Sequence, residues 1–216
     1  MSASRLSIYN DALLIAGERA LASLTENREP RYLLDQVWNN DGVLACLEEG
    51  QWFFAMRTIQ IDYDPDFGQP FGFNRAFNKP DDWVVTSAVC SDEFFRVPVT
   101  RYSDEAGYWY ADVDTLYIKY VSSDPDYGLD LGKWPRSFTE FVAAHFAMKV
   151  VLKITNDEQR LQKALALRQK ALDMAKNKCA MAEPTAFPAQ GTWSRSRTRW
   201  MGRNDGGNGN NGNLIG

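Results

Sequence analysis

Residues 137–178 read SFTEFVAAHFAMKVVLKITNDEQRLQKALALRQKALDMAKNK. This stretch contains two capping boxes, Ser137 to Glu140 and Thr155 to Glu158, and each predicts that a helix begins there. Apolar side chains recur at helical spacing after both boxes. The first helix would turn inward Phe138, Phe141, Val142, His145, Met148 and Leu152; the second, ending near Lys178, carries Leu161, Leu165 and Leu172. Because almost no linker separates the two helices, residues 123–183 are predicted to form a helical hairpin.

Two further helices are expected in residues 1–50. A short amphipathic helix spans Leu6 to Ala16, and a break at Gly17 follows it. A longer helix has Pro30 in its first turn, where the missing N–H costs nothing. We expect that helix to continue to about Glu49, just before Gly50.

The composition changes in residues 51–122. Short runs rich in aromatic and β-branched residues are separated by Gly, Pro and Asp, which is typical of strands and turns. The predicted strands are Trp52–Ile61, Trp83–Val89, Phe94–Val97, Tyr108–Ala111 and Leu116–Val121. The sequence therefore predicts an α+β fold, in which an antiparallel helical bundle contains an inserted small β-sheet.

After Glu183 the chain changes again, and residues 184–216 are predicted to form an extended C-terminal arm with a tail rich in Gly and Asn. Such a composition cannot bury enough apolar surface to fold alone. Within it, arginines alternate with small polar residues between two tryptophans: Trp193, Arg195, Arg197, Arg199 and Trp200. Trp and Arg are enriched at binding hot spots, so we expect this arm to dock on another protein. Stacking of Trp on bases, with Arg on phosphates, is the alternative that makes the arm a single-strand nucleic-acid binder.

Charge is distributed unevenly along the chain. The 24 basic and 28 acidic residues leave a net charge of −4, which argues against a dedicated nucleic-acid binder. Residues 146–178 carry +5 and residues 184–216 carry +3, so the remaining residues carry −12. This segregation indicates electrostatic complementarity between copies or partners, and the second helix of the hairpin offers Arg160, Lys163 and Lys170 as contacts.

Motifs for catalysis, metals and cofactors are weak or missing. The three cysteines are far apart in the sequence and form no CxxC pair, and the single histidine, His145, is predicted to be a core or subunit-contact residue. Asp62, Asp64 and Asp66 resemble the start of a calcium loop, but Phe67 stands where that loop needs Gly. We interpret DPDFG (64–68) and DPDYG (124–128) as Asp-Pro turns. No metal, no cofactor, no cleavable signal and no membrane span are expected.

Four segments, in collinear order, carry a resemblance to a known family. They are LSIYNDALLIAGERALASLTE (6–26), FNRAFNKPDDWVV (73–85), LYIKY (116–120) followed by WPRSF (134–138), and WSRSR (193–197). Together they resemble phage tail tubular protein A, the head-to-tail adaptor of short-tailed bacteriophages. Lys79 stands where that family usually has Leu.

The resemblance implies a structural virion protein rather than an enzyme. Members of the family form twelve-fold rings between the portal and the tail nozzle protein, tail tubular protein B, and DNA passes through the ring without specific binding. By this resemblance the protein would be assembled in the host cytoplasm and lie in the virion neck. Its arm would clamp the portal and its β-rich middle would meet the tail.

Other functions stay open from the residues alone. The acidic β-rich middle could form a carbohydrate hydrolase that acts on host surface polymers, provided that two carboxylates face one cleft.

For a ring that conducts DNA, we expect an acidic or neutral bore, because tight phosphate binding would impede passage. The basic helix would then face a neighbouring subunit or the portal.

Overall fold

A computed structural model describes residues 3–68 and 70–182 of the chain. In those residues the protein is mixed α+β, with five α-helices and two small antiparallel three-stranded sheets. The helices are α1 (Arg5–Ala16), α2 (Glu29–Asn39), α3 (Gly42–Glu48), α4 (Arg136–Thr155) and α5 (Glu158–Ala182). The strands are β1 (Met56–Asp62), β2 (Arg75–Asn78), β3 (Trp83–Cys90), β4 (Tyr102–Glu105), β5 (Tyr108–Ala111) and β6 (Thr115–Ser122). The predicted α+β class is confirmed.

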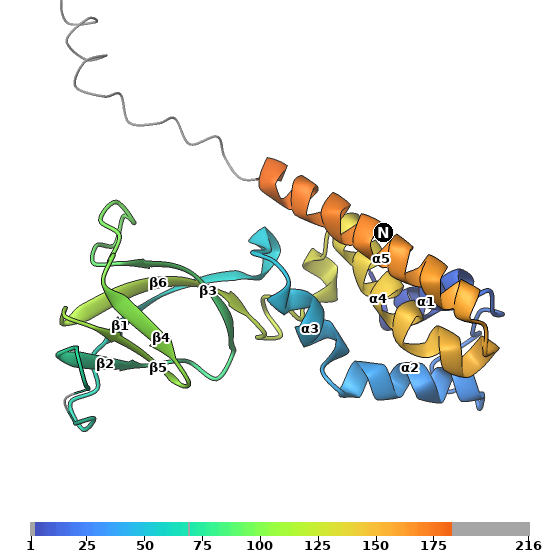
Figure 1. Ribbon diagram of the computed structural model, residues 1–216, viewed down its shortest axis with the longest axis horizontal. Coiled ribbons are helices and arrows are strands. Elements are labelled where there is room, and N and C mark those ends of the chain that lie inside the picture. Colours follow the sequence, from blue (N-terminus) through green and yellow to red (C-terminus); the bar gives the residue numbers. More distant parts are fainter. Residues whose placement is uncertain (1–2, 69, 183–216) are drawn as a thin grey trace, which may run out of the picture. The chain divides into compact units, whose positions relative to one another are not determined.

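Helix α4 is the centre of the helical part. It contacts each of the other four helices, and Figure 1 shows α4 and α5 side by side. Phe138, Phe141 and Phe146 of α4 are buried together with Tyr9 of α1 and Leu34 of α2. Helix α4 is apolar on most of its circumference, which is the pattern of a helix buried among others.

The β-rich part consists of two sheets that share one apolar core. One sheet has the strand order β1-β6-β3 and the other β2-β5-β4, and all pairings are antiparallel. Alternate side chains of each strand point to one face, so the inward residues of both sheets form one cluster. That cluster contains Phe77, Val89, Trp109, Ala111, Leu116, Ile118 and Tyr120.

Both predicted capping boxes are wrong as helix starts. Helix α4 begins at Arg136 after Pro135, so Ser137 lies inside the first turn, where it is buried. Thr155 is the last residue of α4, and its hydroxyl donates a hydrogen bond to the carbonyl of Val151 at 2.8 Å. The N-terminal turn of α5 is capped instead by Asp157. Its carboxylate accepts hydrogen bonds from the backbone N–H groups of Gln159 (2.8 Å) and Arg160 (3.3 Å).

The single helix predicted from Pro30 to Glu49 is interrupted between α2 and α3. Asp41 has a positive φ of 59°, which ends the regular helical path. Gly42 follows, and a Cβ atom at that position would lie 2.5 Å from the carbonyl oxygen of Val37. The close approach of these two backbone segments therefore requires glycine at position 42.

Four of the five predicted strands are present, and the strand predictions were wrong in three respects. Phe94–Val97 is not a strand, because the Asp92 carboxylate accepts hydrogen bonds from the N–H groups of Arg96 and Val97 and closes a loop. The short strands β2 and β4 were not predicted. Residues 53–55 form a 3₁₀ turn, so β1 begins at Met56 rather than at Trp52.

Both Asp-Pro segments are turns, as predicted. The Asp64 carboxylate accepts a hydrogen bond from the N–H of Asp66 (3.0 Å), and the Asp124 carboxylate accepts one from the N–H of Asp126 (2.8 Å). Bonds of this kind from Asp to the backbone two residues later define Asx turns.

Candidate binding surfaces

Helix α5 has one exposed face on which basic and large apolar side chains alternate. The side of α5 that packs on the other helices buries Ala164, Leu172, Ala175 and Cys179. Leu167, Met174 and Met181 recur every seven residues and are 47%, 42% and 84% exposed. Side chains at this spacing share one face of a helix. We use the name α5 face for five residues on this side of the helix: Lys163, Leu167, Lys170, Met174 and Met181.

The three basic residues singled out on α5 have different surroundings. Lys163 and Lys170 are exposed and make no hydrogen bond or ion pair with any described residue. Arg160 instead donates a hydrogen bond from its guanidinium to the carbonyl oxygen of Ala16 at 3.0 Å, and so binds the last turn of α1. It also lies 3.5 Å from the Asp157 carboxylate. Arg160 therefore joins α5 to α1, whereas Lys163 and Lys170 are available to a partner.

The predicted arm residues Trp193, Arg195, Arg197, Arg199 and Trp200 lie outside the described residues. Their assignment to a portal contact stays a prediction from the sequence.

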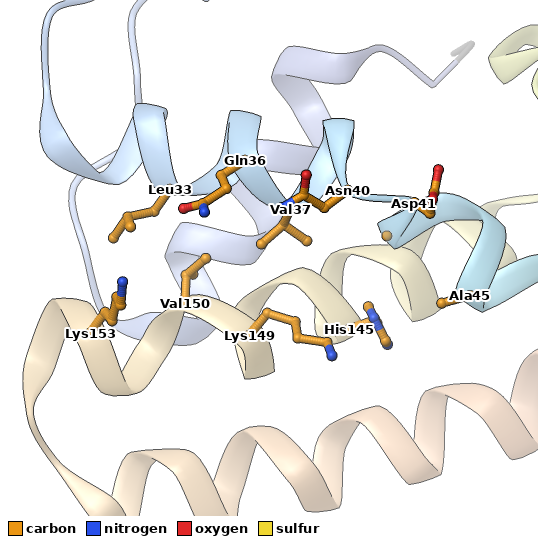
Figure 2. A pocket seen from close by; sticks show the side chains of 11 residues that line it. Leu33, Gln36, Val37, Asn40, Asp41, Ala45, His145, Lys149, Val150 and Lys153 are labelled. Atoms are coloured by element: carbon orange, nitrogen blue, oxygen red, sulfur yellow. The ribbon is translucent and has the colours of Figure 1, made fainter.

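A cleft opens between α2, α3 and α4 (Figure 2). Its volume is about 330 Å³. We call Leu33, Val37 and Val150 the apolar wall, and Lys149 and Lys153 the basic rim. Both rim lysines are exposed and form no ion pair within the described part of the chain. Asp41 also borders the cleft, but its side chain points away from Lys149 (Figure 2).

His145 lines the same cleft and is only 4% exposed. Its Nδ1 accepts a hydrogen bond from Nε of Arg168 at 3.1 Å, and Arg168 also forms an ion pair with Glu49. Burial lowers the pKa of His145 to about 4, with the charges of Arg168 and Lys149 adding to the effect. The imidazole is therefore neutral near pH 7, and because Nδ1 accepts, the proton is on Nε2.

The Nε2–H group of His145 is a buried donor without an acceptor in the described part of the chain. Such an unsatisfied group typically costs about 1–3 kcal/mol. Because Nε2 is closed to solvent, a ligand in the cleft would meet the basic rim, which attracts negatively charged groups, rather than this N–H. Burial of His145 agrees with the sequence prediction, but the missing hydrogen bond has no sequence signal.

Two carboxylates in the β-rich part, Asp82 and Asp104, belong to structural networks. Asp82 accepts hydrogen bonds from Tyr120 (3.0 Å), Arg57 (2.9 Å) and Ser122. Burial works to raise the pKa of Asp82, but these hydrogen bonds outweigh it, and the pKa lies below its usual value. Asp104 is held in a similar way by Lys79 (2.5 Å) and Thr86 (2.6 Å). These groups fasten the strands to one another and to neighbouring loops.

Of four clefts in the described part of the chain, none has two carboxylates among its lining residues. Asp41, Asp64 and Glu49 each border a different cleft, and the fourth cleft has no acidic residue. In residues 3–68 and 70–182, no group of three or more His, Cys, Asp or Glu is arranged to hold a metal ion. None of the helices in these ranges combines the length and the apolar character of a membrane span.

No protein-family model matches the chain, and no curated protein sequence matches it.

Proposed function

We propose that this protein is a structural virion component: a head-to-tail adaptor that forms a ring between the portal and the tail nozzle, through which DNA passes. The observation that carries the proposal is the α5 face. It exposes three large apolar side chains to water beside two lysines that pair with no described residue. Exposed apolar patches of this kind, rimmed by polar groups, mark protein interaction sites.

A closed ring needs two different surfaces on each copy, one for each neighbour. The α5 face is basic, and the chain outside residues 146–178 and 184–216 carries a net −12. Opposite charges on two flanks favour head-to-tail contact between copies and disfavour contact of like flanks. We therefore propose that the α5 face meets a neighbouring copy or the portal, and that the bore is acidic or neutral so that DNA passes without specific binding.

The proposed architecture is more specific than the α+β class alone. In it the five helices form an antiparallel bundle, the strands are inserted between α3 and α4, and residues 184–216 extend as an arm. The element order supports this: helices occupy residues 5–48 and 136–182, and all six described strands lie between them.

The β-rich part is proposed to face the tail nozzle protein. Four rings form a row along β5 and the loop before β2: Phe67, Phe73, Tyr108 and Tyr110. Tyr108 and Tyr110 are stacked with centroids 6.1 Å apart, and Phe67 lies 4.6 Å from Tyr108. Phe71 nearby is fully exposed. Aromatic side chains are enriched at protein interfaces, which supports a partner at this end.

The arm is proposed to clamp the portal through Trp193, Arg195, Arg197, Arg199 and Trp200. Ordering an arm on a partner takes part of the binding energy, so the free protein is expected to be monomeric and to assemble on the portal. Truncation of a hot-spot Trp costs about 2 kcal/mol or more. Replacing both Trp193 and Trp200 by Ala is therefore expected to weaken docking severely.

The test is to mix the purified full chain with portal rings encoded by the same genome, and to examine the product by native mass spectrometry and electron microscopy. The expected result is a portal that gains a ring of many copies, twelve by the family resemblance. That ring should be lost on truncation after Glu183 and weakened by the double Trp variant. If the protein stays monomeric and does not bind the portal, the proposal is wrong.

The alternatives have less support. A carbohydrate hydrolase needs a pair of carboxylates across one cleft, and none of the four compared clefts has one. Single-strand nucleic-acid binding depends on the arm, and its mark would be a steep decrease of affinity with salt.

A further inference from the structure

The loop between β3 and β4 presents an acid and an aromatic ring together. Asp92 closes this loop by accepting hydrogen bonds from the N–H groups of Arg96 (3.0 Å) and Val97 (2.8 Å). Glu93 and Phe94, which we call the loop tip, lie at its outer end. Phe94 is 67% exposed, and Glu93 makes no hydrogen bond or ion pair with any described residue.

The residue after the loop tip has an unusual backbone conformation. Phe95 has a φ of 54°, which is rare for a bulky side chain. Such strain persists only where surrounding contacts maintain it, and it gathers at functional sites. Here the hydrogen bonds to Asp92 maintain it, so the loop holds the tip outward in one conformation.

The cleft between α2, α3 and α4 offers what the loop tip lacks. Its apolar wall can cover a ring, and its volume of about 330 Å³ exceeds the roughly 150 Å³ of an engineered cavity that holds benzene. Its basic rim supplies two exposed ammonium groups that form no ion pair with any described residue. A carboxylate next to an aromatic ring matches both the apolar wall and the basic rim.

We propose that the loop tip of one copy docks in the cleft of the next copy in the ring. Phe94 packs against the apolar wall, and the Glu93 carboxylate accepts hydrogen bonds from Lys149 and Lys153 of the basic rim. The loop tip and the cleft are different surfaces of one chain, so the contact is head-to-tail and can close a ring. The inference rests on the proposed function and deepens it, because it names two surfaces that join the copies.

The first test is a charge exchange, measured as the copies bound per portal over a range of protein concentrations. Glu93→Lys alone, and Lys149→Glu with Lys153→Glu, should each weaken ring assembly by about a factor of ten or more, since like charges then face each other. The triple variant should recover most of the loss. All three side chains are exposed, so the thermal midpoint of each free variant should stay close to that of the wild type.

The matched control pairs Glu93→Lys with Lys163→Glu and Lys170→Glu on the α5 face. The charges are the same, but these lysines are not in the cleft, so no recovery is expected.

A second readout uses cysteine cross-linking in the assembled ring. Glu93→Cys combined with Lys149→Cys should give a ladder of disulfide-linked copies under oxidising conditions. Glu93→Cys alone and the wild type, whose three cysteines are buried, should give none.

The outcomes separate this inference from the proposed function. Recovery in the triple variant together with the ladder would support the docking. If rings form on the portal, the charge variants assemble as well as the wild type and no ladder appears, the proposed docking is wrong. The adaptor function would not be affected by that result. Failure of the wild type to bind the portal would overturn both.

Discussion

At the scale of single residues, the pair His145 and Arg168 connects stability to pH. Arg168 donates a hydrogen bond to Nδ1, so a second proton can be added to the imidazole only by breaking that hydrogen bond. Lys149 and Arg168 both add positive potential at the ring, and Arg168 is itself paired with Glu49. Folding therefore favours the neutral imidazole.

This arrangement predicts a loss of stability in mild acid. The pKa of His145 is lowered from 6.5 to about 4 on folding, so below pH 6.5 the unfolded chain takes up a proton that the native chain refuses. The contribution of the neutral His145 to the free energy of unfolding is fully present above pH 6.5 and is lost progressively between pH 6.5 and about 4. It amounts to about 3 kcal/mol over that window. Urea unfolding of the wild type at pH 7 and pH 4.5 measures it.

The control for that experiment is His145→Gln, which cannot titrate. Its free energy of unfolding should change much less between the same two pH values. A wild type and a variant with equal pH dependence would show that another group is responsible.

A second residue-scale prediction concerns two glycines. A Cβ at Gly128 would lie 2.1 Å from the carbonyl oxygen of Ser122, whereas a Cβ at Gly68 has nothing within 4 Å. Gly128→Ala should therefore destabilise the protein by about 1–3 kcal/mol, as overpacking does. Gly68→Ala should stay within about 0.5 kcal/mol of the wild type. Thermal unfolding of both variants makes the comparison, and equal midpoints would contradict it.

At the scale of elements, the junction between α4 and α5 depends on one side chain. Asn156 has a positive φ of 49° at the end of α4, and Asp157 then caps α5 through two backbone N–H groups. The two helices therefore turn back on each other with no residue between the C-cap and the N-cap.

We expect Asp157→Ala to lower the free energy of unfolding by about 1 kcal/mol, because it removes the cap. Asp157→Asn should retain most of the stability, since an amide oxygen also accepts. Thr155→Ala is the matched control and should be nearly neutral, because its hydroxyl only donates back to Val151 within α4. A larger loss of stability for the Thr155 variant than for the Asp157 variant would show that Thr155 caps α5, as the sequence predicted.

At the scale of the whole molecule, the α5 face should affect assembly without affecting folding. Leu167→Ser with Met174→Ser removes apolar surface that is already half exposed, so the thermal midpoint of the free protein should change little. Ring formation on the portal should fall by about a factor of ten, as for loss of interface anchors. Native mass spectrometry of the portal complex measures this.

Leu152→Ser is the matched control, since Leu152 is also exposed but lies on α4. It should leave ring formation unchanged. Equal effects of the two changes would show that the α5 face is no special contact.

Sequence patterns predicted the elements with strong periodicity and missed those set by local hydrogen bonds. The helix over residues 6–16, the two long helices and the longer strands are where they were expected. Asp92 removed a predicted strand, Asp41 divided a predicted helix, and Asp157 displaced Thr155 as a cap. In each case a short acidic side chain or a left-handed backbone position decides the local path, and periodicity does not register it.

The same distinction applies to the candidate sites: sequence patterns identify some of their residues, and the contacts of those residues appear only in the structure. The basic residues of α5 were identified from the sequence, and the exposed stripe beside them could have been found from the seven-residue spacing of Leu167, Met174 and Met181. That Arg160 binds the end of α1, and is thereby unlike Lys163 and Lys170, depends on a contact between residues 144 positions apart.

By itself the sequence determined the α+β class, the order of helices and strands, and the separation of an acidic body from a basic helix, because these follow from periodicity and composition. Only the tertiary structure decided that the six described strands form two small sheets, that the buried N–H of His145 has no acceptor among the described residues, and that an acidic loop tip is exposed elsewhere on the same chain. Pairing of strands and burial of single atoms depend on which distant segments meet, and the pattern along the chain does not contain that information.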